Sequence, residues 1–177
     1  MKYFKKLAGR RVYLSPINMD DLQQYTQWLN DPVVAGNIGA AANVFTLPRE
    51  RAALEDMTKD GHNFAIVTLD GDRLLGNTGL FDVNHLRRTA NCGIFIGDAD
   101  ARGQGYGGEA MRLLLKYGFE TLNLNNVMLD AFEFNVGAIK CYENVGFKHI
   151  GRRRQSYFLN GRYYDQVIMD ILPGDLL

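Results

Sequence analysis

The stretch ARGQGYGGEA, residues 101–110, sets four glycines and an arginine directly before MRLLLKYGFETL, which has the pattern of a helix. Glycines at a strand-to-helix corner let the backbone approach a ligand closely, and the first free N–H groups of a helix point outward at the positive end of its dipole. Such a corner suits a pyrophosphate. The alternative is a tight turn with a close helix contact and no ligand.

Two common nucleotide-binding loops do not fit this corner. A P-loop continues with Lys and then Ser or Thr, whereas this chain continues with Glu109 and Ala110. A dinucleotide fingerprint follows the first strand of a βαβ unit, but here three strands with an antiparallel pattern precede the glycines. The sequence therefore predicts a phosphate site for another kind of ligand.

Hydrophobic periodicity and turn residues predict the elements around the corner. Strands are expected at residues 11–17, on either side of Asp70-Gly71, at 88–97, at 127–132 and on either side of Asn160-Gly161. Helices are expected at residues 20–30, 48–59, 111–122 and 136–145. The predicted order is β α α β β β α β α β β, a mixed α/β fold. Residues 33–45 have weak periodicity and predict no element.

Composition limits the classes of function. The 177 residues, of which 46% are hydrophobic, suit one domain spanning 1–177. The chain has 20 basic residues (Lys and Arg) and 20 acidic residues (Asp and Glu), so its formal net charge is zero. A protein without net charge does not attract nucleic acid or an anionic membrane by long-range electrostatics. No window approaches eighteen consecutive apolar residues, and Cys92 and Cys141 lack a metal-ligand spacing. We expect a cytoplasmic protein with no nucleic-acid partner, no membrane segment and no metal.

Two motifs resemble a known family. Residues 102–107, RGQGYG, resemble the Arg/Gln-x-x-Gly-x-Gly/Ala loop of the GNAT N-acetyltransferases, and residues 135–147, NVGAIKCYENVGF, resemble the later Asn, Ala, Tyr and Gly-Phe segment of that family. The likeness extends over nearly the whole chain. It is closest to the branch of ribosomal-protein N-terminal, spermidine and flagellar amino-sugar acetyltransferases. The resemblance implies a mostly antiparallel sheet with a central parallel strand pair that splays for acetyl-CoA.

The resemblance also implies the site. Acetyl-CoA is the expected donor, with its pyrophosphate held by the backbone N–H groups from Arg102 to Gly107. Its pantetheine is expected beside the strand that precedes the corner, and Asn135 is expected to contact a pantetheine amide while capping a helix. Tyr142 is the expected catalytic residue, donating a proton to the leaving thiolate. The implied cofactor-binding residues are Ile94, Phe95, Ile96, Arg102, Gly103, Gln104, Gly105, Tyr106, Gly107 and Asn135.

The group that deprotonates the acceptor amine stays open. Relatives often place a glutamate on the strand before the corner, where this chain has Asn91, Cys92 and Gly93. Cys92 alternates with Ile94 and Ile96, which favours a buried thiol over a nucleophile. The other candidate bases are His85, Asp130, Glu133, Asp31 and Glu55. We expect deprotonation through water ahead of any one of them.

The predicted activity is transfer of acetyl from acetyl-CoA to a primary amine by direct attack in a ternary complex. The acceptor is a small molecule or a peptide: a protein N-terminus, a polyamine or an amino sugar. Acidic residues Asp20, Asp21 and Asp31 favour a polyamine, whereas residues 152–154, RRR, favour an anionic acceptor. Residues 162–172 could pair across a homodimer. The alternative function is a catalytically weak CoA-binding sensor or partner module.

Overall fold

The computed structural model describes residues 2–59 and 61–177. Its elements, in chain order, are β1 (Leu7–Ala8), β2 (Val12–Pro16), η1 (Met19–Asp21), α1 (Leu22–Leu29), α2 (Pro32–Asn37), α3 (Leu47–Lys59), β3 (Asn63–Thr68), β4 (Leu74–Asn84), β5 (Thr89–Ile96), η2 (Ala99–Ala101), α4 (Tyr106–Lys116), η3 (Tyr117–Thr121), β6 (Asn126–Phe132), α5 (Val136–Val145), β7 (Lys148–Leu159), β8 (Arg162–Ile171) and η4 (Pro173–Asp175).

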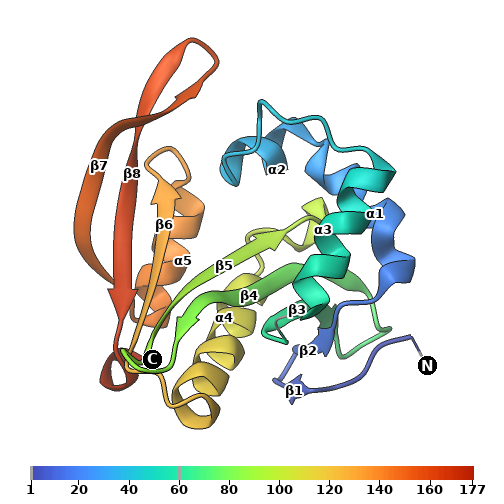
Figure 1. Ribbon diagram of the computed structural model, residues 1–177, viewed down its shortest axis with the longest axis horizontal. Coiled ribbons are helices and arrows are strands. Elements are labelled where there is room, and N and C mark those ends of the chain that lie inside the picture. The colour runs from blue at the N-terminus through green and yellow to red at the C-terminus, as the bar shows by residue number, and fades with distance from the viewer. Residues whose placement is uncertain (1, 60) are drawn as a thin grey trace.

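The strands form one 8-stranded sheet in the order β1-β2-β3-β4-β5-β6-β8-β7 (Figure 1). Neighbouring strands are antiparallel except β5 and β6, which are parallel and are joined by the crossover through α4. The predicted hairpins around Asp70-Gly71 and Asn160-Gly161 are both present. These observations confirm the predicted mixed α/β fold with a mostly antiparallel sheet.

The parallel pair separates soon after it begins. Pairing between β5 and β6 covers Thr89 to Asn91 on one strand and Asn126 to Met128 on the other. Beyond this point β5 continues to Ile96 and β6 to Phe132, and Figure 1 shows the two strands diverging. In the described residues, the edge of β5 that faces β6 therefore has no strand partner after Asn91.

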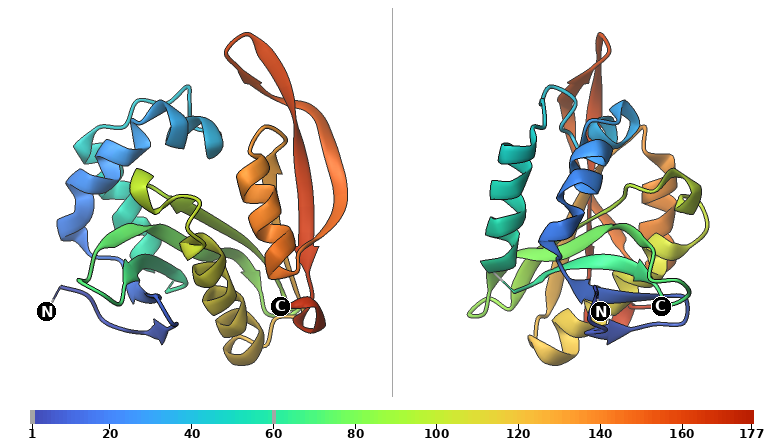
Figure 2. Two further views of the ribbon diagram at one scale, coloured as in Figure 1. Left: turned by 180° about the vertical axis from the view of Figure 1, so that it is seen from behind. Right: turned by 90° about the vertical axis from the view of Figure 1, so that its right-hand side faces the viewer.

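Helices cover both faces of the sheet (Figure 2). On one face, α4 and α5 bury a core that includes Met111, Leu114 and Leu115 of α4, all within the helix predicted at residues 111–122. On the other face, α1 and α3 bury a second cluster of Leu22, Tyr25, Trp28 and Leu54. Strand β5 contributes to both cores, because its side chains alternate. Ile94 and Ile96 share the face that packs with α4, as their alternation predicted, and Phe95 lies on the other face and packs with α1.

Two elements were not predicted. The two-residue strand β1 pairs with β2, and helix α2 occupies part of the segment that predicted no element. Asp31 caps α2 by accepting from the backbone N–H of Val33 at 2.9 Å, and Pro32 occupies its first turn. The sequence Asn-Asp-Pro therefore ends α1 and also begins α2, since Asp and Pro are as common at a helix start as after a helix end.

The strand that was predicted to pair across a homodimer lies inside the sheet and not at its edge. Strand β8 lies between β6 and β7, and its edge toward β6 is paired with that strand from Gln166 to Ile171. The exposed edge at this end of the sheet belongs to β7. Edge-to-edge pairing of two copies at this end of the sheet could use β7, and the homodimer stays a prediction.

Candidate active site

The glycine corner presents a row of free backbone donors. Gly103 and Gly105 have φ of 72° and 85°, a left-handed conformation that glycine adopts without a steric penalty. Gly105 caps α4 with no side chain, and the first bond into the helix runs from Glu109 N to Gly105 O at 3.2 Å. In the described part of the chain, no backbone N–H from Gly103 to Gly108 donates to another group. Such a row of free donors at a helix start binds anions.

Arg102 joins the corner to the end of β5. Its guanidinium donates to the carbonyl oxygens of Ile96 at 3.0 Å and Gly97 at 2.8 Å, and it pairs with Asp31 at 3.5 Å. Its backbone N–H donates to Ala99 O at 3.2 Å, so the free donors begin one residue later than the sequence predicted. Arg102 therefore fixes the position of the corner relative to β5, through bonds that occupy both its side chain and its backbone N–H.

The start of α4 lies directly against β5. A Cβ atom built on Gly107 would contact the side chains of Ile96 at 3.7 Å and Ile94 at 3.8 Å. A larger side chain at Gly107 would push the first turn of α4 away from the strand. The sequence grouped Ile94, Ile96 and Gly107 in one site, and the structure brings them together.

An N-terminal clamp, made by Arg11, Tyr106, Gln104 and Glu109, holds the corner from outside. The Arg11 guanidinium donates to Gln104 O at 2.8 Å and lies over the Tyr106 ring, 4.0 Å from its centroid. The Glu109 carboxylate accepts from the backbone N–H groups of Arg10 and Arg11 at 2.6 and 2.8 Å. Carbonyl and N–H point in opposite directions across a trans peptide. By donating to the Gln104 carbonyl, Arg11 fixes the orientation of the Gln104–Gly105 peptide and therefore of the Gly105 N–H, which is one of the free donors.

Tyr142 of α5 lies at the divergence of β5 and β6. Burial raises the pKa of its phenol, and the nearby Cys92 on β5 and Asp130 on β6 raise it further. The side chain is 8% exposed. Its hydroxyl has no hydrogen-bond partner among the described residues and is not sealed from solvent. A phenol with a raised pKa stays protonated at neutral pH, so it can donate a proton.

Asn135 begins α5, as the sequence predicted. Its side chain accepts from the backbone N–H of Ala138 at 3.2 Å, which is the N-cap bond. Phe134 and Phe132 precede it at the end of β6. The cap places Asn135 beside the end of the strand that diverges from β5, and its contact with pantetheine stays a prediction.

Most of the predicted bases are engaged elsewhere. Glu133 pairs with Arg152 at 2.8 Å and accepts from Asp165 N at 3.0 Å, whereas Asp130 accepts from the Gln166 side chain. Asp31 caps α2, and Glu55 and His85 are exposed. Asn91, which stands where relatives often have glutamate, donates to Asp82 at 2.9 Å. Burial raises the pKa of the Cys92 thiol and leaves it inert.

An aromatic wall that the sequence did not predict stands beyond the divergence. It consists of Phe132, Phe134, Tyr157 and Tyr164. Phe132 and Tyr157 stack with centroids 4.1 Å apart, and Phe134 meets Tyr164 edge-on at 4.8 Å. The Tyr157 hydroxyl is buried and lacks a partner among the residues that the structure describes. The alternating aromatic residues before Asn135 and around Asn160-Gly161 are the signal that could have indicated this wall.

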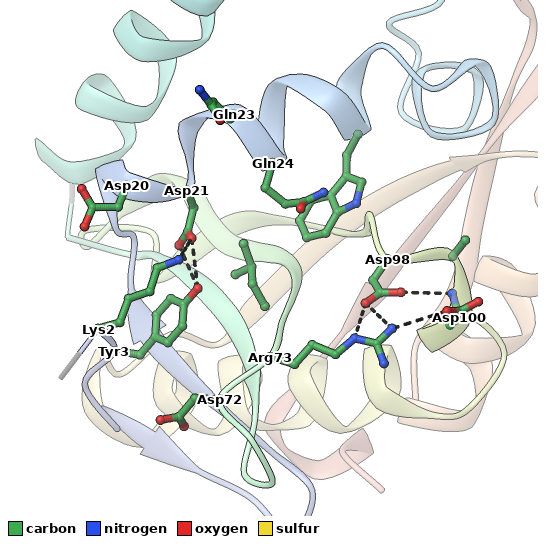
Figure 3. Close-up of a pocket in the computed structure, with 13 residues that line it drawn as sticks. Lys2, Tyr3, Asp20, Asp21, Gln23, Gln24, Asp72, Arg73, Asp98 and Asp100 are labelled. Atoms are coloured by element: carbon green, nitrogen blue, oxygen red, sulfur yellow. Dashed lines mark hydrogen bonds and ion pairs between the residues drawn. The ribbon is translucent and has the colours of Figure 1, made fainter.

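A separate acidic hollow of about 670 Å³ lies between α1, the β3–β4 turn and η2 (Figure 3). Asp20, Asp21, Asp72, Asp98 and Asp100 line it together with Lys2 and Arg73. Asp21 is engaged by Lys2 and by the Tyr3 hydroxyl, and Arg73 pairs with Asp98. The hollow does not include Tyr142 or the glycine corner, so Asp20 and Asp21 lie away from the candidate active site, whereas Asp31 pairs with Arg102 at the corner.

Neither a metal cluster nor a membrane span is found in the described ranges. No three His, Cys, Asp or Glu side chains there gather closely enough to hold a metal ion. No helix in residues 2–59 and 61–177 has both the length and the apolar composition to cross a membrane.

Comparison with known proteins identifies the family. A family model described as "Acetyltransferase (GNAT) domain" matches residues 11–148. The chain belongs to the GNAT family and is an acyltransferase, and the acetyl donor of this family is acetyl-CoA. The predicted family, enzyme class and donor are confirmed.

Individual relatives agree with the family. The chain is 28% identical to the "Probable N-acetyltransferase YjcK" of Bacillus subtilis over 96% of this chain and 98% of that protein. It is 33% identical to the spermidine N(1)-acetyltransferase of Escherichia coli over 63% of this chain and 59% of that protein.

Solved structures share the fold. A GNAT-family acetyltransferase from Bacillus anthracis has a TM-score of 0.82 at 19% identity and covers 94% of this chain and 97% of that chain. Spermidine N-acetyltransferase from Vibrio cholerae, solved with CoA and spermine, has a TM-score of 0.82 at 24% identity and covers 93% of this chain and 96% of that chain. At these identities the likeness supports the fold and not the acceptor.

Proposed function

We propose that this protein transfers acetyl from acetyl-CoA to a primary amine of a small molecule in a ternary complex, with a polyamine as the first acceptor to test. The observation that carries the proposal is the row of free N–H groups from Gly103 to Gly108, which follows the C-terminal end of the diverging strand β5. The spermidine N(1)-acetyltransferase of Escherichia coli, at 33% identity, supports a polyamine.

The row of donors suits the pyrophosphate of acetyl-CoA. From the corner, the unpartnered edge of β5 from Cys92 to Ile96 leads toward the divergence. Backbone N–H and C=O groups on such an edge can pair with the amides of pantetheine as a strand would. We infer that Ile94, Phe95 and Ile96 bind the pantetheine arm, and that the thioester lies between β5 and Tyr142.

The residues at the divergence can then assist each stage of transfer. A backbone N–H of β5 donates to the oxyanion that develops when the amine nitrogen attacks the thioester carbonyl. As the C–S bond breaks, Tyr142 donates its phenolic proton to the leaving thiolate. The raised pKa of Tyr142 keeps that proton available at neutral pH. The aromatic wall borders the opening on the β6 side and is the proposed boundary of the acceptor pocket.

Two measurements test this function. Acetyl-CoA at about a hundred times its Kd should stabilise the protein by about 2.7 kcal/mol, and ATP or NAD should give no shift. Release of free thiol should follow addition of an acceptor from a panel of polyamines, amino sugars and peptides with free N-termini. A thermal shift with acetyl-CoA but no thiol release with any amine would contradict catalysis and favour a CoA sensor.

A further inference from the structure

Glu50, in the first turn of α3, is a buried carboxylate that has no partner among the residues the structure describes. It is 4% exposed and lies one turn before Leu54, on the stripe of α3 that packs against α1. Buried Asp21 and Thr78 are both hydrogen-bonded. No side-chain hydrogen bond or ion pair of Glu50 occurs within residues 2–59 and 61–177. A buried charge without a partner is costly, which points to a role other than stability.

Burial changes the acidity of this group. Loss of hydration raises the pKa of Glu50 to about 7, and the neighbouring Arg49 offsets the shift only in part. The carboxylate is not sealed, because no oxygen of Glu50 is both enclosed and unpartnered. A carboxyl group that titrates near neutral pH and keeps a path to solvent can accept a proton during a reaction cycle.

The position of Glu50 connects it to the proposed acetyl site. Glu50 lies close enough to Tyr25 of α1 to raise the pKa of that phenol. The Tyr25 ring packs against Phe95 of β5 with centroids 6.2 Å apart, and its hydroxyl lies 3.4 Å from Gly76 O. Gly76 is paired with Ile96. Glu50 therefore lies on the α1–α3 side of the same strand whose other side carries α4 and the glycine corner.

The charged and titratable groups around Glu50 do not neutralise it. Arg49 precedes it on α3 and lies against the Phe45 ring, with 4.9 Å between guanidinium and centroid. Tyr25 faces it from α1 and is uncharged, because burial raises its pKa well above the usual value. Asp21 of η1 is engaged by Lys2 and Tyr3. In the described residues, therefore, no cationic side chain pairs with the ionised form of Glu50.

We propose that Glu50 binds the ammonium group of the acceptor and receives the first proton that this group loses. This inference rests on the proposed function. The carboxylate takes one proton from R–NH3⁺ and leaves R–NH2, whose lone pair forms the C–N bond to the acetyl carbon. The C–S bond breaks, and the thiolate takes the phenolic proton of Tyr142. The second nitrogen proton returns to Tyr142 as the amide forms, and the proton on Glu50 leaves to solvent.

The test compares Glu50→Gln with Glu55→Gln, a change of the same kind at an exposed position on the same helix. Thiol release from acetyl-CoA is followed between pH 5.5 and 9.5 with spermidine or whichever amine of the panel reacts. We expect wild-type kcat/KM to rise through about pH 7 and Glu50→Gln to lose this limb. The loss should be about 100-fold at pH 7 and smaller at pH 9.5, where solvent supplies neutral amine. Glu55→Gln should match the wild type, and Glu50→Asp should recover part of the rate.

Measurements of thermal stability and of acetyl-CoA binding separate this catalytic role of Glu50 from a structural one. The folded state favours the protonated form of Glu50, so wild-type stability falls as pH rises from about 4.5 through about 7. Glu50→Gln should therefore have a higher Tm than the wild type at pH 8, an equal Tm at pH 4, and an unchanged shift with acetyl-CoA. Wild-type turnover in Glu50→Gln at every pH would overturn the inference and leave the proposed function standing. No thiol release from the wild type with any amine would overturn both.

Discussion

The glycine corner and the α1–α3 side of β5 lie against the same strand, yet the chain builds them differently. The corner is contiguous in sequence, and its free groups are backbone N–H groups from Gly103 to Gly108. The α1–α3 side is assembled from side chains of separate elements, among them Glu50, Tyr25 and Phe95. A site made of backbone depends on φ and ψ, whereas a site made of side chains depends on packing. A substitution at the corner should therefore act through the backbone conformation, whereas a substitution on the α1–α3 side should act through side-chain packing.

The largest effect is expected at the corner itself. Gly105→Val forces a β-branched residue to a φ of 85° and displaces the row of N–H groups. Loss of two hydrogen bonds to a charged group would weaken acetyl-CoA binding by about 100-fold or more, measured by calorimetry.

Gly71→Val is the matched control for strain. Gly71 has a φ of 76° and open space around it, in the turn between β3 and β4. Both variants should lose stability, but only Gly105→Val should lose affinity for acetyl-CoA. Equal affinity in the two variants would mean that the corner does not hold the phosphates.

The second-largest effect is expected on kcat, from a substitution of Tyr142. Tyr142→Phe removes the proton donor and keeps the ring, so kcat should fall by about 100-fold while acetyl-CoA affinity stays the same. Because the pKa of this phenol is raised, wild-type kcat should show no alkaline loss below pH 10. Steady-state kinetics with calorimetry measures both quantities. A fall in affinity without a fall in kcat would assign Tyr142 to packing alone.

A smaller effect is expected for the N-terminal clamp. Arg11→Ala removes the bond to Gln104 O and the contact with Tyr106, so the Gly105 N–H loses its fixed direction. Loss of one charged hydrogen bond corresponds to about tenfold weaker acetyl-CoA binding. Arg10→Ala is the control, because Arg10 contributes its backbone N–H to Glu109 and the substitution keeps that group. The same loss in both variants would indicate a general charge effect.

The smallest effect is expected in the aromatic wall. Tyr157→Phe removes a buried hydroxyl that has no partner in the described structure, so the free energy of unfolding should rise by up to about 1 kcal/mol. If the acceptor bonds to this hydroxyl, its KM should also rise several-fold while acetyl-CoA affinity stays constant. Denaturant titration and acceptor KM measure the two effects. An unchanged KM would place the acceptor away from Tyr157.

The sequence predicted the local backbone motifs well and the contacts between distant side chains poorly. Residues 101–110 and 135–147 indicated the family, the donor and the N-cap at Asn135, because each motif is local and its glycines and cap have fixed conformations. Helix α2 was missed, since Asp31 and Pro32 look the same at the end of one helix and the start of another. Glu50 was missed because a charged residue in an amphipathic helix is usually solvated.

The sequence by itself determined the mixed α/β order, the burial of α4 and the free backbone groups at the corner, all of which depend on short-range periodicity and on backbone conformation. The tertiary structure alone decided where β5 and β6 separate, that Glu133 and Asp31 are engaged by arginines, and that Glu50 is not. Burial and pairing are properties of what packs around a side chain. They arise between residues distant in sequence, such as Glu50 and Tyr25.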